Sequence, residues 1–248
     1  MYQPLKKLLL VSAFSCLYVV TFSQSGIDIF KKMHKRYGGK WYRTFSFIQT
    51  TDFYRNDSLK RTDTWYEAAS FPYDFRIDFK DPRAGNAVIY KEDSTYRFQN
   101  GKLSGVEGGT NPFTFLLGGM YAVSAENAIA KLTSQGYDLN KTYETDWSGS
   151  KAIVIGADRG DTVSKQFWVD KKDFYIVRTI EKDHDVLIDA HMLDHVQIKK
   201  GWSETKVEIF LNGKLRQVEK YRDLKGDLKL DKRLFEPSQF GKVFWQGK

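Results

Sequence analysis

The stretch Tyr73-Asp74-Phe75-Arg76-Ile77-Asp78-Phe79 decides the fold class, because apolar and charged side chains alternate along it without interruption. Successive side chains of a β-strand point to opposite faces, so the apolar residues share one face and the charged residues share the other. This alternation is typical of an antiparallel strand that packs one face against the core.

The same alternation recurs on both sides of this stretch. Phe45 and Phe47 repeat it toward the N-terminus, and Tyr96 and Phe98 repeat it toward the C-terminus. Residues that favour turns separate the runs, and Asn212-Gly213 joins two of them as a short hairpin. The whole pattern predicts roughly ten strands.

Two regions break the strand pattern. Residues 27–37 carry an apolar stripe with helical spacing that Gly38-Gly39 ends, which predicts a helix packed across the domain. Residues 112–121 are apolar without alternation, and Ser124 is then suited to N-cap a helix that stops at Gly136. A sheet interrupted by an apolar, partly helical insert suggests a lid or plug over its concave face.

The first 23 residues have the three parts of a secretory signal peptide. Lys6 and Lys7 are its positive region, the apolar run Leu8–Val20 follows, and Thr21-Phe22-Ser23 places small residues before a cleavage site. The apolar run is shorter than the ~20 residues of a membrane span. We expect export to the periplasm; an uncleaved anchor and acylation of Cys16 are the alternatives.

The mature chain, residues 24–248, is expected to form one β-rich domain. Its composition is even, without a repeat or a linker. The one cysteine of the sequence, Cys16, lies in the signal, so disulfides and thiol catalysis are excluded from the mature chain. A chain of this length buries roughly 70% of its unfolded surface, which is enough for a core without cross-links.

The charge of the chain is basic but dispersed. Its formal net charge is +8, and it falls to +6 when Lys6 and Lys7 leave with the signal. The densest basic cluster, residues 31–36, is interpreted as a solvated helix face, with a weak contact to anionic lipid headgroups as the alternative. Nucleic acid is not expected as a partner of an exported chain.

The histidines are the first candidates for catalytic or metal-binding residues. His184, His191 and His195 crowd one stretch, but the even spacing of apolar residues from 188 to 198 predicts a strand with a solvated face. Two histidines four residues apart on a strand are ~13 Å apart, too far for one metal ion. The motifs G-x-S-x-G and H-E-x-x-H are absent. We predict no catalytic residue, no metal and no cofactor, although a pair of carboxylates from different strands stays open.

The aromatic content is high, with 6 Trp, 14 Tyr and 18 Phe. One interpretation is a well-packed β-sandwich or barrel. The other is a curved sheet with one face lined by aromatic rings and closed by the midchain insert. Such a cavity would hold acyl chains by burial, at ~0.8 kcal/mol per CH₂ group.

Five short motifs follow one another along nearly the whole mature chain. They are Thr44-Phe45-Ser46-Phe47-Ile48-Gln49, Trp65 with Pro72 and Phe75-Arg76-Ile77, Asn111-Pro112-Phe113 before Leu116-Leu117, Gln166-Phe167-Trp168-Val169-Asp170 with Ile176-Val177-Arg178, and Leu234-Phe235-Glu236-Pro237. In this order they resemble the LolA-like proteins, the periplasmic carriers of bacterial lipoproteins and their relatives.

The resemblance implies a mainly β fold with a few helices: a curved, antiparallel, half-open barrel closed by helices. It also implies a cavity for the acyl chains of a lipoprotein, taken from an inner-membrane transporter and handed to an outer-membrane acceptor. Relatives bind other lipids or sense stress. The carriers have a lid-latching arginine directly before the strand proline, where this chain has Phe71 before Pro72. A lid held by apolar packing, or a different ligand, is therefore expected.

We predict a monomeric periplasmic protein that carries or senses a lipoprotein acyl chain or another lipid. The alternatives are a non-carrying envelope interaction or sensor module with a filled core, and an envelope lipid or glycan hydrolase. The predicted cavity residues are Phe45, Phe47, Trp65, Phe71, Tyr73, Phe75, Ile77, Tyr96 and Phe98, and the predicted lid residues are Phe113, Phe115, Leu116 and Leu117.

Overall fold

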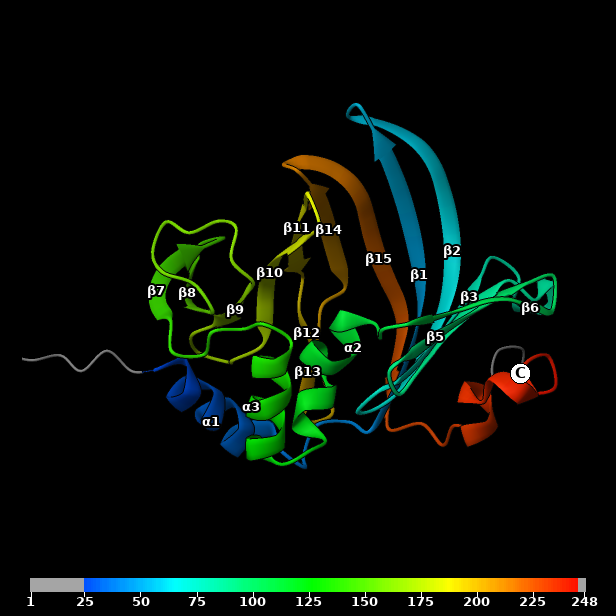
Figure 1. The fold of residues 1–248 in the computed structure, drawn as a ribbon, viewed down its shortest axis with the longest axis horizontal. Helices are drawn as coiled ribbons and strands as arrows, with labels where there is room; N and C mark the ends of the chain where they lie inside the picture. Colours follow the sequence, from blue (N-terminus) through cyan, green and yellow to red (C-terminus); the bar gives the residue numbers. More distant parts are fainter. Residues whose placement is uncertain (1–24, 245–248) are drawn as a thin grey trace, which may run out of the picture.

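The computed structural model describes residues 25–244, so the predicted signal peptide, residues 1–23, lies outside the described residues. Its main feature is one 13-stranded sheet with the strand order β6-β5-β4-β3-β2-β1-β15-β14-β11-β10-β9-β8-β7. Every pairing in this sheet is antiparallel. The sheet curves strongly but does not close into a barrel (Figure 1), which confirms the predicted fold class.

The strands of the large sheet are β1 (Thr44–Arg55), β2 (Ser58–Ser70), β3 (Asp74–Phe79), β4 (Ala87–Lys91), β5 (Ser94–Gln99), β6 (Lys102–Gly108), β7 (Thr142–Trp147), β8 (Ser150–Ile155), β9 (Gln166–Asp170), β10 (Ile176–Asp183), β11 (Val186–Leu193), β14 (Lys206–Leu211) and β15 (Lys214–Gly226). The short strands β12 (Val196–Ile198) and β13 (Gly201–Ser203) pair with each other. The described residues thus hold more strands than the roughly ten predicted.

The first helix, α1 (Gly26–Tyr37), begins at a capping box in which Ser25 and Asp28 satisfy each other's backbone N–H groups. Its stripe of Ile29, Phe30, Met33 and Tyr37 is buried in the main core, as the helical spacing predicts. The basic residues of positions 31, 32, 35 and 36 are exposed, as expected for a solvated helix face.

The midchain insert forms α2 (Pro112–Leu117), the 3-10 turn η2 (Gly119–Tyr121) and α3 (Ala125–Ser134). The Asn111 side chain accepts hydrogen bonds from the N–H groups of Phe113 and Thr114, and the Ser124 hydroxyl accepts one from Asn127 N–H. Ser124 caps the helix as the sequence predicts, and Asn111 is a second N-cap that was not predicted. With α1, these helices gather between the two ends of the curved sheet (Figure 1).

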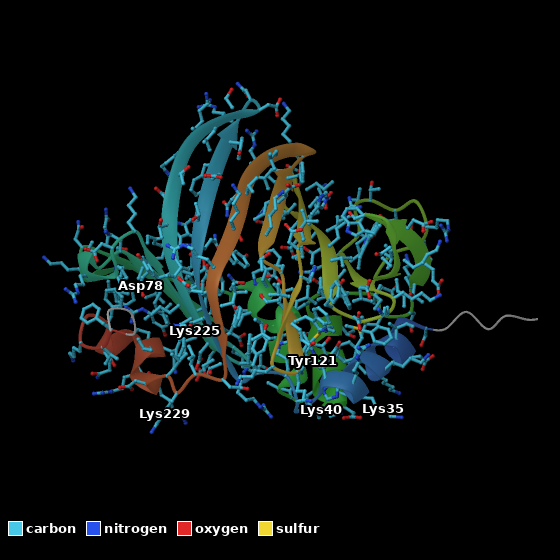
Figure 2. All side chains as sticks on the ribbon, turned by 180° about the vertical axis from the view of Figure 1, so that it is seen from behind. Lys35, Lys40, Asp78, Tyr121, Lys225 and Lys229 are labelled. Carbon is cyan, nitrogen blue, oxygen red and sulfur yellow. The ribbon has the colours of Figure 1, made fainter. Side chains whose placement is uncertain are left out.

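The second face of β3 is buried as well, because the C-terminal 3-10 turns η3 (Lys232–Phe235) and η4 (Pro237–Gln239) cover it. Arg76 and Asp78 lie there almost without exposure and form a bidentate ion pair, with N–O distances of 2.8 and 2.9 Å. The Arg76 guanidinium also donates to Leu234 O at 3.2 Å. Figure 2 shows Asp78 beside this C-terminal segment.

The predicted continuous strand through the histidines is wrong. The chain leaves the large sheet at Asp194, whose φ of 53° lies in the left-handed region, and β12 begins a separate sheet at Val196. The face of β11 that carries His191 is not solvated either, since Trp147 and Phe210 pack against that ring. Among the described residues, no helix is long and apolar enough to cross a membrane.

Candidate functional site

A cavity of about 310 Å³ lies between the concave face of the sheet and α2. Its volume falls within the roughly 300–1,000 Å³ that small-molecule sites occupy. The lining residues come from the strands on both sides of β1, from α2, and from the segment around β13. The cavity is therefore the partly open space that the curvature of the sheet and the lid create together.

Most of the predicted sheet-side residues line this cavity. Residue alternation places them on the concave face, where cross-strand partners such as Phe45 and Ala69, or Glu67 and Ile77, stand side by side. The predicted residues found in the lining are Phe45, Phe47, Trp65, Phe71, Phe75 and Ile77.

Three predicted sheet residues do not line the cavity. Tyr73 precedes β3 and stacks on Phe115, with ring centroids 5.8 Å apart. Arg97 is the β5 residue that faces the cavity, so its neighbours Tyr96 and Phe98 point to the opposite face. There the Phe98 ring stacks on Phe240 at 3.8 Å. The alternation correctly predicts that Tyr96 and Phe98 share one face of β5, but that face points away from the cavity.

Two of the four predicted lid residues face the cavity and the other two face the core, because of their spacing on α2. Phe113 and Leu117 are four residues apart, so they share a face of α2 and line the cavity. Phe115 and Leu116 point away from it into the main core, where both are almost fully buried. Half of the predicted lid set therefore anchors the helix rather than facing the cavity.

The lid meets the sheet through an aromatic ring and two glycines. A Cβ atom on Gly118 would lie 2.5 Å from Cζ of Phe71, and one on Gly119 would lie 2.3 Å from Pro72 O. Only glycine permits this approach. Phe71 thus touches the lid by apolar packing.

The sequence reasoning missed a group of acidic residues inside the cavity. Glu67 of β2, Glu219 of β15 and Glu204, directly after β13, all line it and are only 4%, 9% and 7% exposed. Gln49, Gln217 and Tyr221 accompany them in the lining. We call Glu67, Glu204 and Glu219 the acidic patch.

Burial and mutual repulsion disfavour the charged forms of the acidic patch. Burial raises the pKa of Glu67 well above its ordinary value, and the neighbouring Glu219 and Glu204 raise it further. Burial raises the pKa of Glu204 to about 7. The pKa of Glu219 is also raised by burial, although hydrogen bonds from Tyr221 and Gln217 oppose this effect.

The three carboxyl groups differ in their hydrogen bonds. Glu219 accepts one bond on each oxygen, from Gln217 Nε2 and from the Tyr221 hydroxyl, both at 2.5 Å. Within the described part of the chain, the Glu67 carboxyl has no hydrogen bond or ion pair. A signal for it was present: in Trp65-Tyr66-Glu67-Ala68-Ala69, the period of two places Glu67 on the face of Trp65.

The histidines lie apart from this cavity. His191 Nε2 is 3.1 Å from the Asp189 carboxylate, and His195 Nε2 is 2.8 Å from Ile176 O. Burial lowers the pKa of His195. Residues 25–244 contain no group of three or more His, Cys, Asp or Glu side chains placed to hold a metal ion.

Solved structures with the same architecture are known. A DUF1329 family protein from Desulfovibrio piger superimposes with a TM-score of 0.59 at 16% identity, over 87% of this chain and 97% of the other. A LolA superfamily protein from Nitrosomonas europaea gives 0.55 at 13% identity, over 88% and 100%. The fold is LolA-like.

A third structure, from Vibrio parahaemolyticus, is described as an outer membrane lipoprotein-sorting protein domain. It gives a TM-score of 0.58 at 12% identity, over 86% of this chain and 97% of the other. No protein-family model matches the chain, and no curated protein matches it in sequence. At these identities the similarity extends to the LolA-like fold, and function has to be argued from the site.

Proposed function

We propose that this chain is a periplasmic binding protein that takes up an acyl chain, from a lipoprotein or another lipid, in the cavity of its LolA-like fold. The observation that carries the proposal is the cavity itself, because it leaves aromatic side chains of the sheet and of α2 facing a partly open space. Burial of each CH₂ group there contributes ~0.8 kcal/mol. An acyl chain can therefore be bound through burial alone, and the proposal needs no chemical reaction.

The proposal includes the predicted sheet residues that line the cavity, together with Phe113 and Leu117 of the lid, as the apolar contacts. Exchange of the ligand requires α2 to move. Its contact with the sheet through Phe71 and Gly118 is apolar, so the lid could part without breaking a hydrogen bond at that point. An inner-membrane donor and an outer-membrane acceptor belong to this proposal, by analogy with lipoprotein sorting.

A pair of matched variants tests the binding role. Phe113→Asp places a charge in the cavity from the half-buried side of the lid, whereas Leu103→Asp adds the same charge at an exposed position of β6, at 55% exposure. With a fluorescent fatty-acid analogue as probe, we expect the mature protein and Leu103→Asp to enhance its fluorescence alike, and Phe113→Asp to lose most of the enhancement.

The outcomes separate the alternatives. A folded mature protein that leaves the probe unchanged would favour an interaction module instead of a carrier. Turnover of a lipid or glycan, abolished by replacement of a carboxylate without loss of stability, would favour a hydrolase.

A further inference from the structure

The acidic patch is a polar region in a cavity whose other walls are mainly aromatic and aliphatic. Its carboxyl groups come from three segments that are far apart in the sequence, around residues 67, 204 and 219, and they meet across the concave face. Glu219 and Glu204 both raise the pKa of Glu67, and Glu219 raises the pKa of Glu204, which places the three groups within electrostatic reach of one another.

Within the acidic patch, Glu67 is the residue whose carboxyl group lacks a hydrogen-bond or ion-pair partner among the described residues. It is 4% exposed, lines the cavity, and has no hydrogen bond or ion pair among residues 25–244. Its carboxyl oxygens are not among the described side-chain atoms that are sealed off without a partner, so they are accessible from the cavity. A ligand with a hydrogen-bond donor or a positive charge could therefore supply the partner that the described fold does not.

A second polar group without a partner comes from the lid. Thr114 is 6% exposed and belongs to the lining of the same cavity, and its Oγ1 atom has no hydrogen-bond partner among the described residues. It lies on α2, whereas Glu67 lies on β2. The Oγ1 atom itself is sealed from the cavity, so an occupant would reach it only if α2 shifted.

The cavity does not supply a cation for the acidic patch. Among its lining residues Arg97 is the cation, and its half-exposed guanidinium is held in an ion pair with Glu107, to whose Oε1 the Nε donates at 2.8 Å. The acidic patch is also not arranged to chelate a metal, since the described residues contain no such group. The positive charge would have to arrive with the ligand.

We propose that the cavity takes an amphiphile with a primary amine beside its apolar chain, and that the ammonium group binds at Glu67, Glu204 and Glu219 while the chain lies against the aromatic wall. This inference rests on the proposed function and specifies its ligand class. The amine could be the free amino terminus of an acylated peptide or the headgroup of an aminolipid, since both present the same ammonium group.

The surroundings of the acidic patch predict how this binding depends on pH. The other titratable groups in the cavity lining are Tyr42, Tyr90, Tyr221 and Arg97, whose guanidinium pairs with Glu107, and the lining contains no histidine. The raised pKa values mean that the empty acidic patch holds protons that an ammonium ligand displaces. Affinity for an amine should therefore increase as the pH rises from about 5 to 8.

The test compares dodecylamine with dodecanol, which has the same chain and no charge, below their micelle concentrations. We expect the mature protein at pH 8 to bind the amine at least about tenfold more tightly, the difference expected of one charge-assisted hydrogen bond. Glu67→Gln should reduce this ratio severalfold while still binding dodecanol. Glu126→Gln, an exposed residue of α3, is the control with the same charge change.

The outcomes distinguish the two levels of the proposal. Equal affinity for amine and alcohol, or a ratio that Glu67→Gln leaves unchanged, overturns the amine inference and leaves acyl-chain binding standing. Failure to bind either compound overturns the proposed function itself.

A second comparison separates the two sources of the amine. A diacylated lipopeptide is compared with its N-acetylated form, and phosphatidylethanolamine with its N-acetyl derivative. A preference for the free amine in the first pair assigns a peptide terminus, and one in the second pair assigns a lipid headgroup. No preference in either pair overturns the inference.

Discussion

Two groups of buried charged side chains lie on opposite faces of the neighbouring strands β2 and β3. On the outer face, Arg76 and Asp78 pair with two hydrogen bonds and are sealed by the C-terminal turns. On the concave face, Glu67 stands opposite Ile77 without any such partner in the described chain. One face has an internally balanced charge pair, and the other has an excess of acid.

We infer from this difference that the outer ion pair serves the stability of the fold and that the acidic patch serves ligand binding. A buried ion pair with complete hydrogen bonding is tolerated because each charge offsets the desolvation of the other. Three carboxyl groups facing a cavity have no such balance, and among the described residues only Glu219 accepts hydrogen bonds from other side chains, one on each oxygen. Sites that bind ligands are where natural proteins retain such unbalanced groups.

The largest expected effect comes from breaking the outer ion pair between Arg76 and Asp78. Asp78→Ala leaves the Arg76 guanidinium buried without its counter-charge and should lower the free energy of unfolding by about 3–5 kcal/mol. Asp146→Ala, which removes the exposed partner of Lys151, should cost no more than about 1 kcal/mol. Urea denaturation of both variants measures the difference. Similar small losses would show that the outer pair contributes little to the fold.

The next effect concerns the pH dependence of the acidic patch. The pKa of Glu204 is raised from an ordinary 4.5 to about 7 in the folded state, so the folded protein holds a proton that the unfolded chain has released. The stabilisation is present below pH 4.5 and is lost as the pH rises through 7, by on the order of 3 kcal/mol. Glu204→Gln does not titrate at this position. Its free energy of unfolding, relative to that of the wild type, should therefore rise by that amount between pH 4 and pH 8.

Chemical denaturation at a series of pH values measures this gain, with Glu126→Gln as the exposed control. Parallel stability curves for Glu204→Gln and the wild type would mean that Glu204 is not desolvated in solution.

The smallest effect concerns the lid contact. Gly118→Ala places a Cβ atom against the Phe71 ring and should lower stability by only about 1 kcal/mol, since α2 is able to shift outward. The shift should make a bound probe dissociate faster. Gly105→Ala is the matched control, because nothing lies within 4 Å of its added Cβ atom. Stopped-flow dissociation of the probe compares the two, and equal rates would argue against a lid held by this contact.

Much of the fold could be predicted from local patterns. The alternation in residues 73–79, the stripe of α1 and the cap Ser124 each depend on neighbours within a few residues, and each appears in the structure. The strand count was too low, because strands of three residues such as β12 and β13 are shorter than the pattern requires.

The candidate site was harder to predict, because its membership depends on which face of each strand turns inward. Alternation assigns Tyr96 and Phe98 to a common face, yet the C-terminal residue Phe240 covers that face from 142 positions away in the chain. The acidic patch forms only when β2, β15 and the turn after β13 meet. Glu204 has no local pattern at all, since its burial comes from the helices packed beside it.

The central claim is that the cavity holds an apolar chain in the cell. Mass spectrometry of lipids extracted from the mature protein, purified from the periplasm without detergent, tests it most directly. We predict a lipid or acylated peptide in a ratio near one per chain, with a free amine on it. An empty protein that also fails to take up an apolar probe would contradict the account, and the aromatic residues would then belong to an ordinary core.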